Sequence, residues 1–186
     1  TLKLNYFGAT DVGRRRKNNE DYFGIFEPHD LFVVADGMGG HAAGEIASST
    51  AVQAVAEFVA LTATETDITW PWGVDPNLSL VANRLKTAVR FGNQKVLDLS
   101  LTQADYEGMA TTIVGVLFEN ATARACQLGS SRNRCSYSLS VEPQPAALMM
   151  TASRSSPSKI SMFCRASLRA VSRSPMCTCS APQQPC

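Results

Sequence analysis

The residues best suited to chemistry gather in two short segments near the N-terminus. Asp36 follows a run of four apolar residues and precedes Gly37 in a glycine-rich stretch. Because glycine lets the backbone turn sharply and approach a ligand closely, we expect this carboxylate to lie in an open site rather than in a core. Upstream, the adjacent Glu20 and Asp21 add two carboxylates and Arg16 adds a guanidinium. Carboxylate oxygens suit hard divalent cations, and a guanidinium can bind a phosphate through two parallel hydrogen bonds.

Short apolar runs and helical periodicity indicate which elements must position these side chains. Apolar residues recur every three or four positions over residues 44–59 and 78–99, as in amphipathic helices. Proline and aspartate between two apolar runs indicate a hairpin-like connection over residues 27–30. The expected strands cover residues 2–9, 22–26, 31–35, 109–118 and 121–128. Because strands precede and follow a pair of helices, the order favours an antiparallel α+β layered fold over a doubly wound one.

Length, charge and hydropathy set loose limits on the class of protein. A chain of 186 residues has room for one domain, or for one domain and a tail. Its net charge of +1 gives no reason to expect binding to nucleic acid or to an anionic membrane. No apolar run approaches the ~18–20 residues that span a bilayer, and no basic region followed by an apolar stretch marks a signal peptide. A cytoplasmic location is therefore expected, and the oligomeric state is left open.

The composition of the chain changes abruptly near residue 130. All twelve glycines lie in residues 1–129, whereas residues 130–186 contain fourteen serines, five of the six cysteines and Glu142 as their one acidic residue. Such a segment offers little apolar surface to offset the entropy of ordering, so disorder is one interpretation. The preferred hypothesis is translation out of frame, and a genuine basic, Ser-rich extension is the alternative. The cysteines lack the spacing of a metal site.

Three longer motifs lie in residues 10–21, 34–45 and 107–112. They read T-D-x-G-x-x-R-x-x-N-E-D, V-A-D-G-M-G-G-H-x-x-G-E and E-G-M-A-T-T. In this order they resemble the N-terminal part of a bacterial metal-dependent protein Ser/Thr phosphatase of the PP2C (PPM) family. The resemblance covers residues 1–132 and implies a PP2C-like four-layer αββα sandwich with antiparallel sheets, its C-terminal part missing or replaced. Residues 133–186 would form a separate Ser/Arg/Pro/Cys-rich tail, disordered or out of frame.

The resemblance implies a role for each candidate residue at a site for two Mn²⁺ or Mg²⁺ ions. Asp36 would bridge both ions, and Gly37 would ligate one of them through its carbonyl oxygen. Glu20 would hold the second ion, directly or through its water, and Asp21 would orient the waters of the ions. Arg16 would bind the phosphate of the substrate.

His41 has two interpretations, a general acid near the leaving alkoxide or a structural residue at the start of the following helix. Eukaryotic relatives carry their acidic histidine directly after Asp-Gly, where this chain has Met38. A zinc site of His41 and Glu45 is disfavoured, because two ligands do not make a site. A nucleotide-binding P-loop is excluded, because no lysine and hydroxyl residue follow the last glycine of the run.

The implied function is hydrolysis of phosphoserine and phosphothreonine by a metal-activated water, without a phosphoenzyme. Phosphorylated Ser/Thr proteins are the expected partners, together with a eukaryotic-type Ser/Thr kinase that no residue here identifies. Ser130 stands where the family has a metal-binding aspartate, and residues 130–186 hold no aspartate. Activity of this chain is therefore expected to be impaired. The alternative is a non-catalytic phosphoprotein-binding pseudophosphatase, or a truncated or misfolded product.

Overall fold

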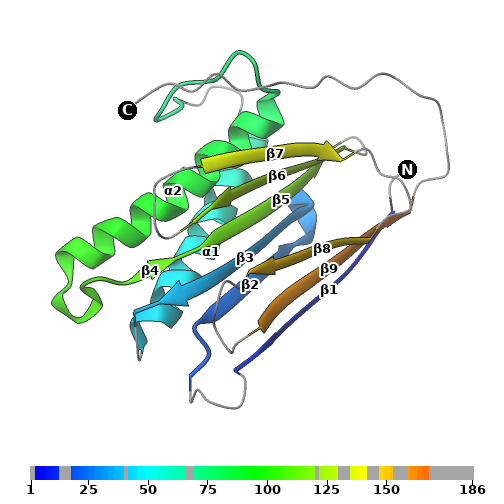
Figure 1. Cartoon of the computed structure of the whole chain (residues 1–186). Coiled ribbons are helices and arrows are strands. Elements are labelled where there is room, and N and C mark those ends of the chain that lie inside the picture. Colours follow the sequence, from blue (N-terminus) through cyan, green and yellow to red (C-terminus); the bar gives the residue numbers. More distant parts are fainter. Residues whose placement is uncertain are drawn as a thin grey trace.

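The computed structural model describes residues 3–12, 18–39, 42–65, 69–119, 122–129, 135–141, 147–152 and 159–167, with only the backbone in the last three ranges. Within these residues two antiparallel sheets face each other, and two helices cover the outer face of the larger sheet (Figure 1). The architecture is therefore layered, with one helical layer and two sheet layers among the described residues.

The larger sheet contains, in spatial order, β2 (Asp21–Phe26), β3 (Leu31–Met38), β5 (Ile113–Glu119), β6 (Thr122–Leu128) and β7 (Cys135–Val141). The short strand β4 (Ala110–Thr111) pairs with the end of β3, and the one-turn helices η1 (Glu27–His29) and η2 (Ala104–Tyr106) occupy connections. The smaller sheet contains β1 (Lys3–Asp11), β9 (Lys159–Ser167) and β8 (Ala147–Ala152) in that order.

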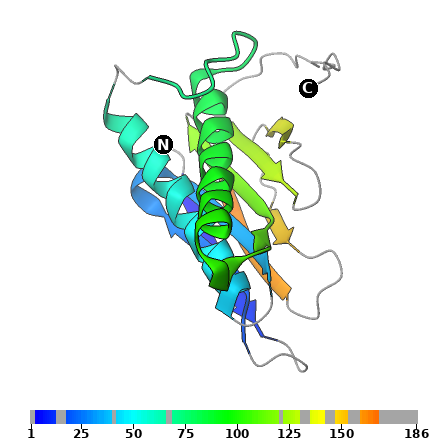
Figure 2. The same cartoon turned by 90° about the vertical axis from the view of Figure 1, so that its left-hand side faces the viewer.

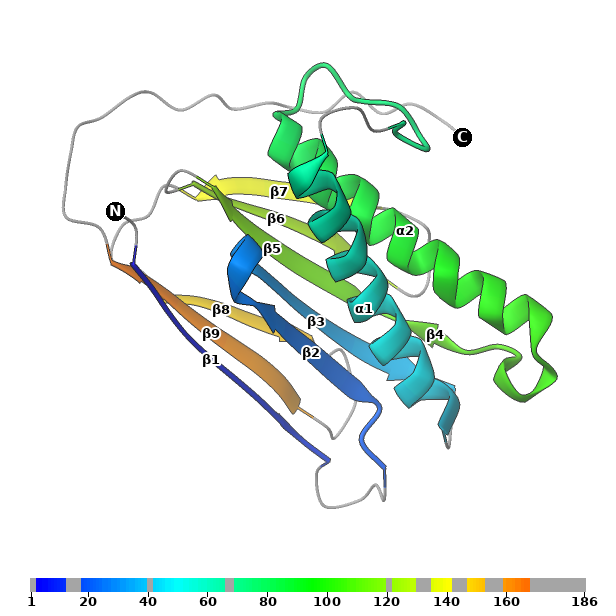
Figure 3. The ribbon, with the colours of Figure 1, turned by 180° about the vertical axis from the view of Figure 1, so that it is seen from behind.

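The helices α1 (Ala42–Thr64) and α2 (Leu80–Thr102) lie side by side across the larger sheet (Figures 2 and 3). Alternate residues of a strand point to opposite faces. Leu31, Val33 and Ala35 of β3 accordingly pack in the core beneath the helices. Phe32 and Val34 face the smaller sheet, where Phe32 lies with its ring centroid 5.4 Å from that of Tyr6. Strand β3 is thus buried on both faces, which explains its continuous apolar sequence.

Helix α1 is long and apolar enough to cross a membrane, judged by length and composition alone. In the fold, 56% of its most apolar window is buried against other elements. A helix in the core of a layered domain has the same composition, because it packs on a sheet and on a second helix.

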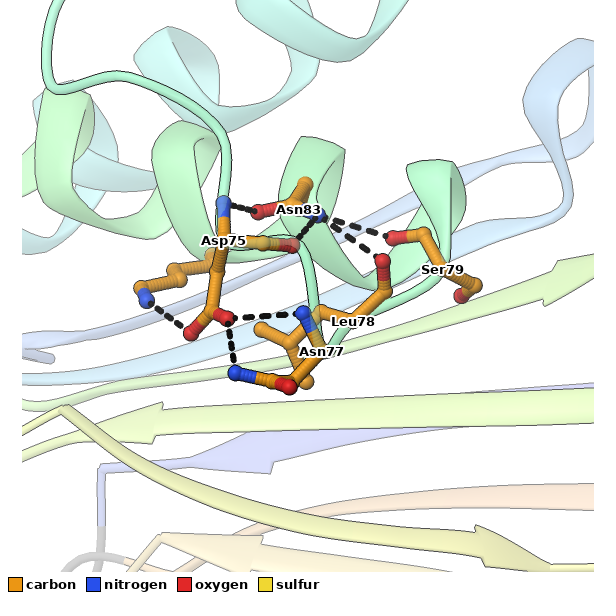
Figure 4. Close-up of polar contacts among 6 residues, drawn as sticks. Asp75, Asn77, Leu78, Ser79 and Asn83 are labelled. Carbon is orange, nitrogen blue, oxygen red and sulfur yellow. Dashed lines mark hydrogen bonds and ion pairs between the residues drawn. The ribbon is translucent and has the colours of Figure 1, made fainter.

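A cluster of polar contacts fixes the start of α2 (Figure 4). The hydroxyl of Ser79 accepts a hydrogen bond from the backbone N–H of Ala82 at 3.2 Å and so caps the helix. The side chain of Asn83 is 1% exposed, accepts from the backbone N–H of Asp75 at 2.8 Å and donates to three carbonyl oxygens of the preceding loop. The buried amide therefore pins the loop to the first turn of the helix.

The predicted α+β fold with antiparallel sheets is confirmed, and every predicted helix and strand is present within a few residues. Two bounds differ. Helix α1 continues to Thr64, beyond the predicted end at residue 59, and the predicted strand over residues 109–118 is interrupted at Thr112. Strands β7, β8 and β9 fall within residues 133–186, and the division of the chain at residue 132 stays a prediction.

Candidate functional site

Strands β2 and β3 place Asp21 directly opposite Asp36. The backbone N–H of Gly37 donates to the carbonyl oxygen of Glu20 at 3.0 Å, so the next pair along the ladder is the hydrogen-bonded one. Asp21 and Asp36 therefore form a non-hydrogen-bonded pair, the type in which Cα atoms are only ~4.5 Å apart and side chains lie closest. Directly opposite side chains share a face of the sheet. The two carboxyl groups consequently lie together at the end of the two strands.

The alternation of side chains along β3 shows which face of the sheet the two carboxyl groups share. Asp36 is on the same face of β3 as Phe32 and Val34, whose side chains pack between the two sheets. Asp21 is 5% exposed, and Asp36 is half-buried. Like charges that lie opposite each other on neighbouring strands destabilise a sheet. A cation bound between the sheets would remove this repulsion.

The side chain of Glu20, one residue before Asp21, lies on the opposite side of the sheet, where its carboxyl group contacts the start of α1. A Cβ on Gly44, in the first turn of α1, would come within 2.8 Å of Cδ and 3.0 Å of Oε1 of Glu20. Glu20 is 9% exposed there. The N-terminus of a helix carries a partial positive charge that favours an anion. The position of Glu20 is therefore explained by α1, and its predicted role as a ligand of a second ion stays a prediction.

Two threonines hold the backbone of Asp36. The N–H of Asp36 donates to Oγ1 of Thr112 at 3.2 Å, and the N–H of Thr112 donates to the carbonyl oxygen of Asp36 at 2.9 Å. The hydroxyl of Thr111 donates to the same carbonyl oxygen at 3.1 Å. These contacts span more than seventy residues of sequence, and the Thr-Thr pair after Met109 and Ala110 was their only sign in the sequence. They fix the end of β3 from the side opposite β2.

The side chain of Asn19 holds in place the segment that leads into β2. Its Nδ2 donates to Oγ1 of Thr10 at 2.9 Å, and its Oδ1 accepts from the backbone N–H of Asp21 at 3.1 Å. The amide thus ties β1 to the backbone that carries Asp21.

The donor set fits a hard divalent cation that keeps part of its water shell. Carboxylate oxygens of Asp21 and Asp36 and the carbonyl oxygen of Gly37 are the ligand types that Mg²⁺ and Mn²⁺ prefer. Within the described part of the chain, no group of three or more His, Cys, Asp or Glu side chains is gathered for an ion. Further ligands would have to be water or lie elsewhere in the chain. Arg16 and His41, predicted as catalytic, lie outside the described residues.

Comparison with known proteins agrees with this geometry. The family model described as protein phosphatase 2C matches residues 12–136. The match covers more than half of the chain, together with the Asp21–Asp36 pair and the Thr111–Thr112 pair. The chain belongs to the protein phosphatase 2C family.

Individual relatives match the same region. The serine/threonine protein phosphatase PstP of Mycobacterium tuberculosis is 36% identical over 132 residues, which is 71% of this chain and 23% of PstP. The serine/threonine phosphatase stp of Listeria monocytogenes is 34% identical over 130 residues, 66% of this chain and 46% of stp. A crystal structure of the PstP catalytic domain in complex with two manganese ions superposes with a TM-score of 0.54 at 31% identity, covering 74% of this chain and 55% of that one. The chain thus spans between 23% and 55% of the length of these relatives.

Proposed function

We propose that this chain carries the N-terminal part of a site that hydrolyses phosphoserine and phosphothreonine in proteins with the aid of Mn²⁺ or Mg²⁺. The observation that carries the proposal is the Asp21–Asp36 cross-strand pair, which places two carboxyl groups on the face between the sheets. Membership of the family supports it, because the similar proteins are named serine/threonine phosphatases and one of them holds two manganese ions.

Each candidate residue would have its own role at such a site. Asp36 would hold both ions, Gly37 would add its carbonyl oxygen, Glu20 would hold the second ion, and Asp21 would orient the waters of the ions. When bound, a pair of divalent cations polarises the phosphoryl group and lowers the pKa of water. Arg16 would bind the phosphate oxygens through two parallel hydrogen bonds, a geometry that lysine cannot provide. Phosphorylated Ser/Thr proteins are the substrates that this chemistry would serve.

We also propose that turnover by this chain is low. Ser130 provides a hydroxyl where the resemblance calls for a carboxylate, and residues 130–186 contain no aspartate. A hydroxyl is neutral, so it offsets less of the positive charge of a divalent cation than a carboxylate does. The affinity for metal, rather than the binding of phosphate, is therefore the property expected to limit activity.

Calorimetric titration of the full chain with Mn²⁺, followed by phosphate release from a phosphothreonine peptide, tests both parts. Wild type is expected to bind Mn²⁺, Asp36→Asn to bind it at least tenfold more weakly, and Ser130→Asp to bind it more tightly and to release phosphate faster. Asp105→Asn removes an exposed carboxylate of η2 and is the matched control, with wild-type affinity expected. Equal Mn²⁺ affinity in Asp36→Asn and wild type would overturn the site, and tight binding without turnover in Ser130→Asp would favour the non-catalytic alternative.

A further inference from the structure

Strand β1 is an outer strand of the smaller sheet (Figures 1 and 3). Within the described residues it pairs with β9 along one side, and no strand pairs with its other side. The N–H and C=O groups along such an edge are a template for pairing with another chain. The outer side of β1 is therefore a candidate interaction surface.

The sequence and the regularity of β1 do not protect this edge. Proteins usually keep edge strands short or interrupt them with proline or a bulge. Strand β1 is nine residues long, compared with roughly 5–6 for a typical strand, and it contains no proline. Its register with β9 runs from residue 3 to residue 11 without a shift. A second strand can therefore pair with β1 along its whole length.

An exposed aromatic side chain lies at the centre of β1. Leu4 and Tyr6 pack against the apolar cluster between the two sheets. Because side chains alternate along a strand, Phe7 lies on the outer face of the smaller sheet, where it is 67% exposed. Asn5 and Asp11 are exposed on the same face. An aromatic ring in this position gains apolar contacts when a second strand is added beside β1.

The sequence of β1 is complementary to itself about Phe7. When two copies of the strand overlap fully in antiparallel orientation, Phe7 lies opposite Phe7 of the second copy. The same register places Lys3 of each copy opposite Asp11 of the other. Aromatic pairs and pairs of opposite charge stabilise a sheet when they lie directly across from each other. Asp11 already interacts within its own chain, and a carboxylate can accept hydrogen bonds from several partners.

Other registers of two β1 strands are less favourable. A shift by one residue would place side chains from opposite faces across from each other. A shift by two residues keeps the faces but removes the Phe7 pair and both pairs of Lys3 with Asp11, and it leaves part of each strand unpaired. The fully overlapped pair has two-fold symmetry and uses the outer side of β1 in both copies, so assembly through this edge stops at a dimer.

We propose that the outer side of β1 binds a second copy of this chain, with the two β1 strands antiparallel about Phe7. The two three-stranded sheets then join into one continuous sheet across a two-fold axis. The interface consists of the backbone ladder, the Phe7 pair and the two pairs of Lys3 with Asp11. A contact between single strands is small, so the dimer is expected to dissociate on dilution. Neither metal binding nor phosphatase activity enters this interface.

Sedimentation velocity of the full chain over a hundredfold range of concentration measures the association. Wild type is expected to shift from monomer to dimer as the concentration rises, without larger species. Phe7→Thr keeps a residue suited to strands but removes the ring, so it should weaken the dimer at least fivefold. Leu101→Thr removes a side chain that is 76% exposed on α2, in the layer that covers the other sheet, and this matched control should associate as wild type does. A wild type that stays monomeric, or that forms larger species, would overturn the proposal.

Introduced cysteines test the register of the two strands. Phe7→Cys places two thiols directly opposite each other, within reach of a disulfide, so mild oxidation should link this variant into a covalent dimer. Asn5→Cys is the matched control on the same exposed face, because two residues 5 lie four positions apart along the strands, roughly 14 Å, and should not link.

Mass spectrometry of the digested dimer distinguishes a bond between two residues 7 from bonds of the six native cysteines. Circular dichroism checks that each variant is folded. A disulfide between two residues 5 that forms as readily as one between two residues 7 would contradict the proposed register. A dimer that Phe7→Thr leaves unchanged would show that the copies associate through another surface.

Discussion

The backbone of Gly37, near the end of β3, lies directly against the carbonyl oxygen of Gly44 in the first turn of α1. A Cβ on residue 37 would overlap that oxygen and would come within 2.6 Å of the carbonyl oxygen of Glu20. Both obstacles are backbone atoms, which cannot rotate away as the end of a side chain can. This contact therefore sets how closely the strand that carries Asp36 and the helix that follows it can pack.

Gly37→Ala is expected to destabilise the fold severely. The added methyl group must displace either α1 or the segment that leads into β2, and such overpacking costs about 3 kcal/mol. Urea denaturation followed by circular dichroism measures the change, with the midpoint lowered and the slope retained.

Gly129→Ala is the matched control for this substitution. A Cβ at Gly129 meets no atom of the described residues within 4 Å, so the free energy of unfolding of this variant should stay within about 0.5 kcal/mol of wild type. Equal effects of the two substitutions would show that the loss at residue 37 does not come from the contact with α1.

Gly44→Ala should depend on the residue at position 20. Alanine is favoured over glycine within a helix by about 1 kcal/mol, but its Cβ would meet Cδ of Glu20 at 2.8 Å. We expect Gly44→Ala to be neutral or destabilising in wild type and to stabilise the Glu20→Ala background by about 1 kcal/mol. A double-mutant cycle of unfolding free energies measures this coupling. Additive effects would mean that Glu20 does not rest against the helix.

The sequence predicted the elements that carry strong local signals. Burial of a strand produces a continuous apolar run, such as the one before Asp36. Burial of one helix face produces apolar residues at three- and four-residue spacing, as in α1 and α2. Both patterns can be read directly from the sequence. The α+β fold followed from the order of these elements. Asp21 and Asp36 were found as separate carboxylates, each at the edge of an apolar run.

Contacts between distant residues could not be predicted in the same way. The register that places Asp21 opposite Asp36 depends on the turn between β2 and β3, where Asp30 adopts a left-handed conformation with φ of 50°. The bonds of Thr111 and Thr112 to Asp36 join segments that only the fold brings together. The amide of Asn83 has an ordinary helical sequence context, and its burial became apparent only from the loop that packs on it.

Thr112→Val should loosen the end of β3. Valine has nearly the shape of threonine but lacks Oγ1, so the N–H of Asp36 loses its acceptor at 3.2 Å. An unsatisfied N–H of this kind costs about 1–2 kcal/mol. Urea denaturation measures the loss, and calorimetry with Mn²⁺ should show weaker binding because the backbone of Asp36 is no longer fixed. Thr112→Ser retains the hydroxyl and should recover most of the Mn²⁺ affinity. A serine variant as weak as the valine variant would point to the methyl group instead.

Asp75 should make a contribution to stability that depends on pH. The backbone N–H of Asn77 donates to its carboxylate at 3.0 Å, and this hydrogen bond, opposed by burial and aided by Lys86, holds the pKa of Asp75 below its ordinary value of 3.8. A carboxyl group with a lowered pKa stabilises the fold fully above that ordinary value, and the contribution is lost as the pH falls through the folded pKa. Asp75→Asn should therefore lower the urea midpoint near pH 6, and this difference from wild type should shrink as the pH falls below 3.8. A difference that keeps the same size as the pH falls would show that the carboxylate charge is not its cause.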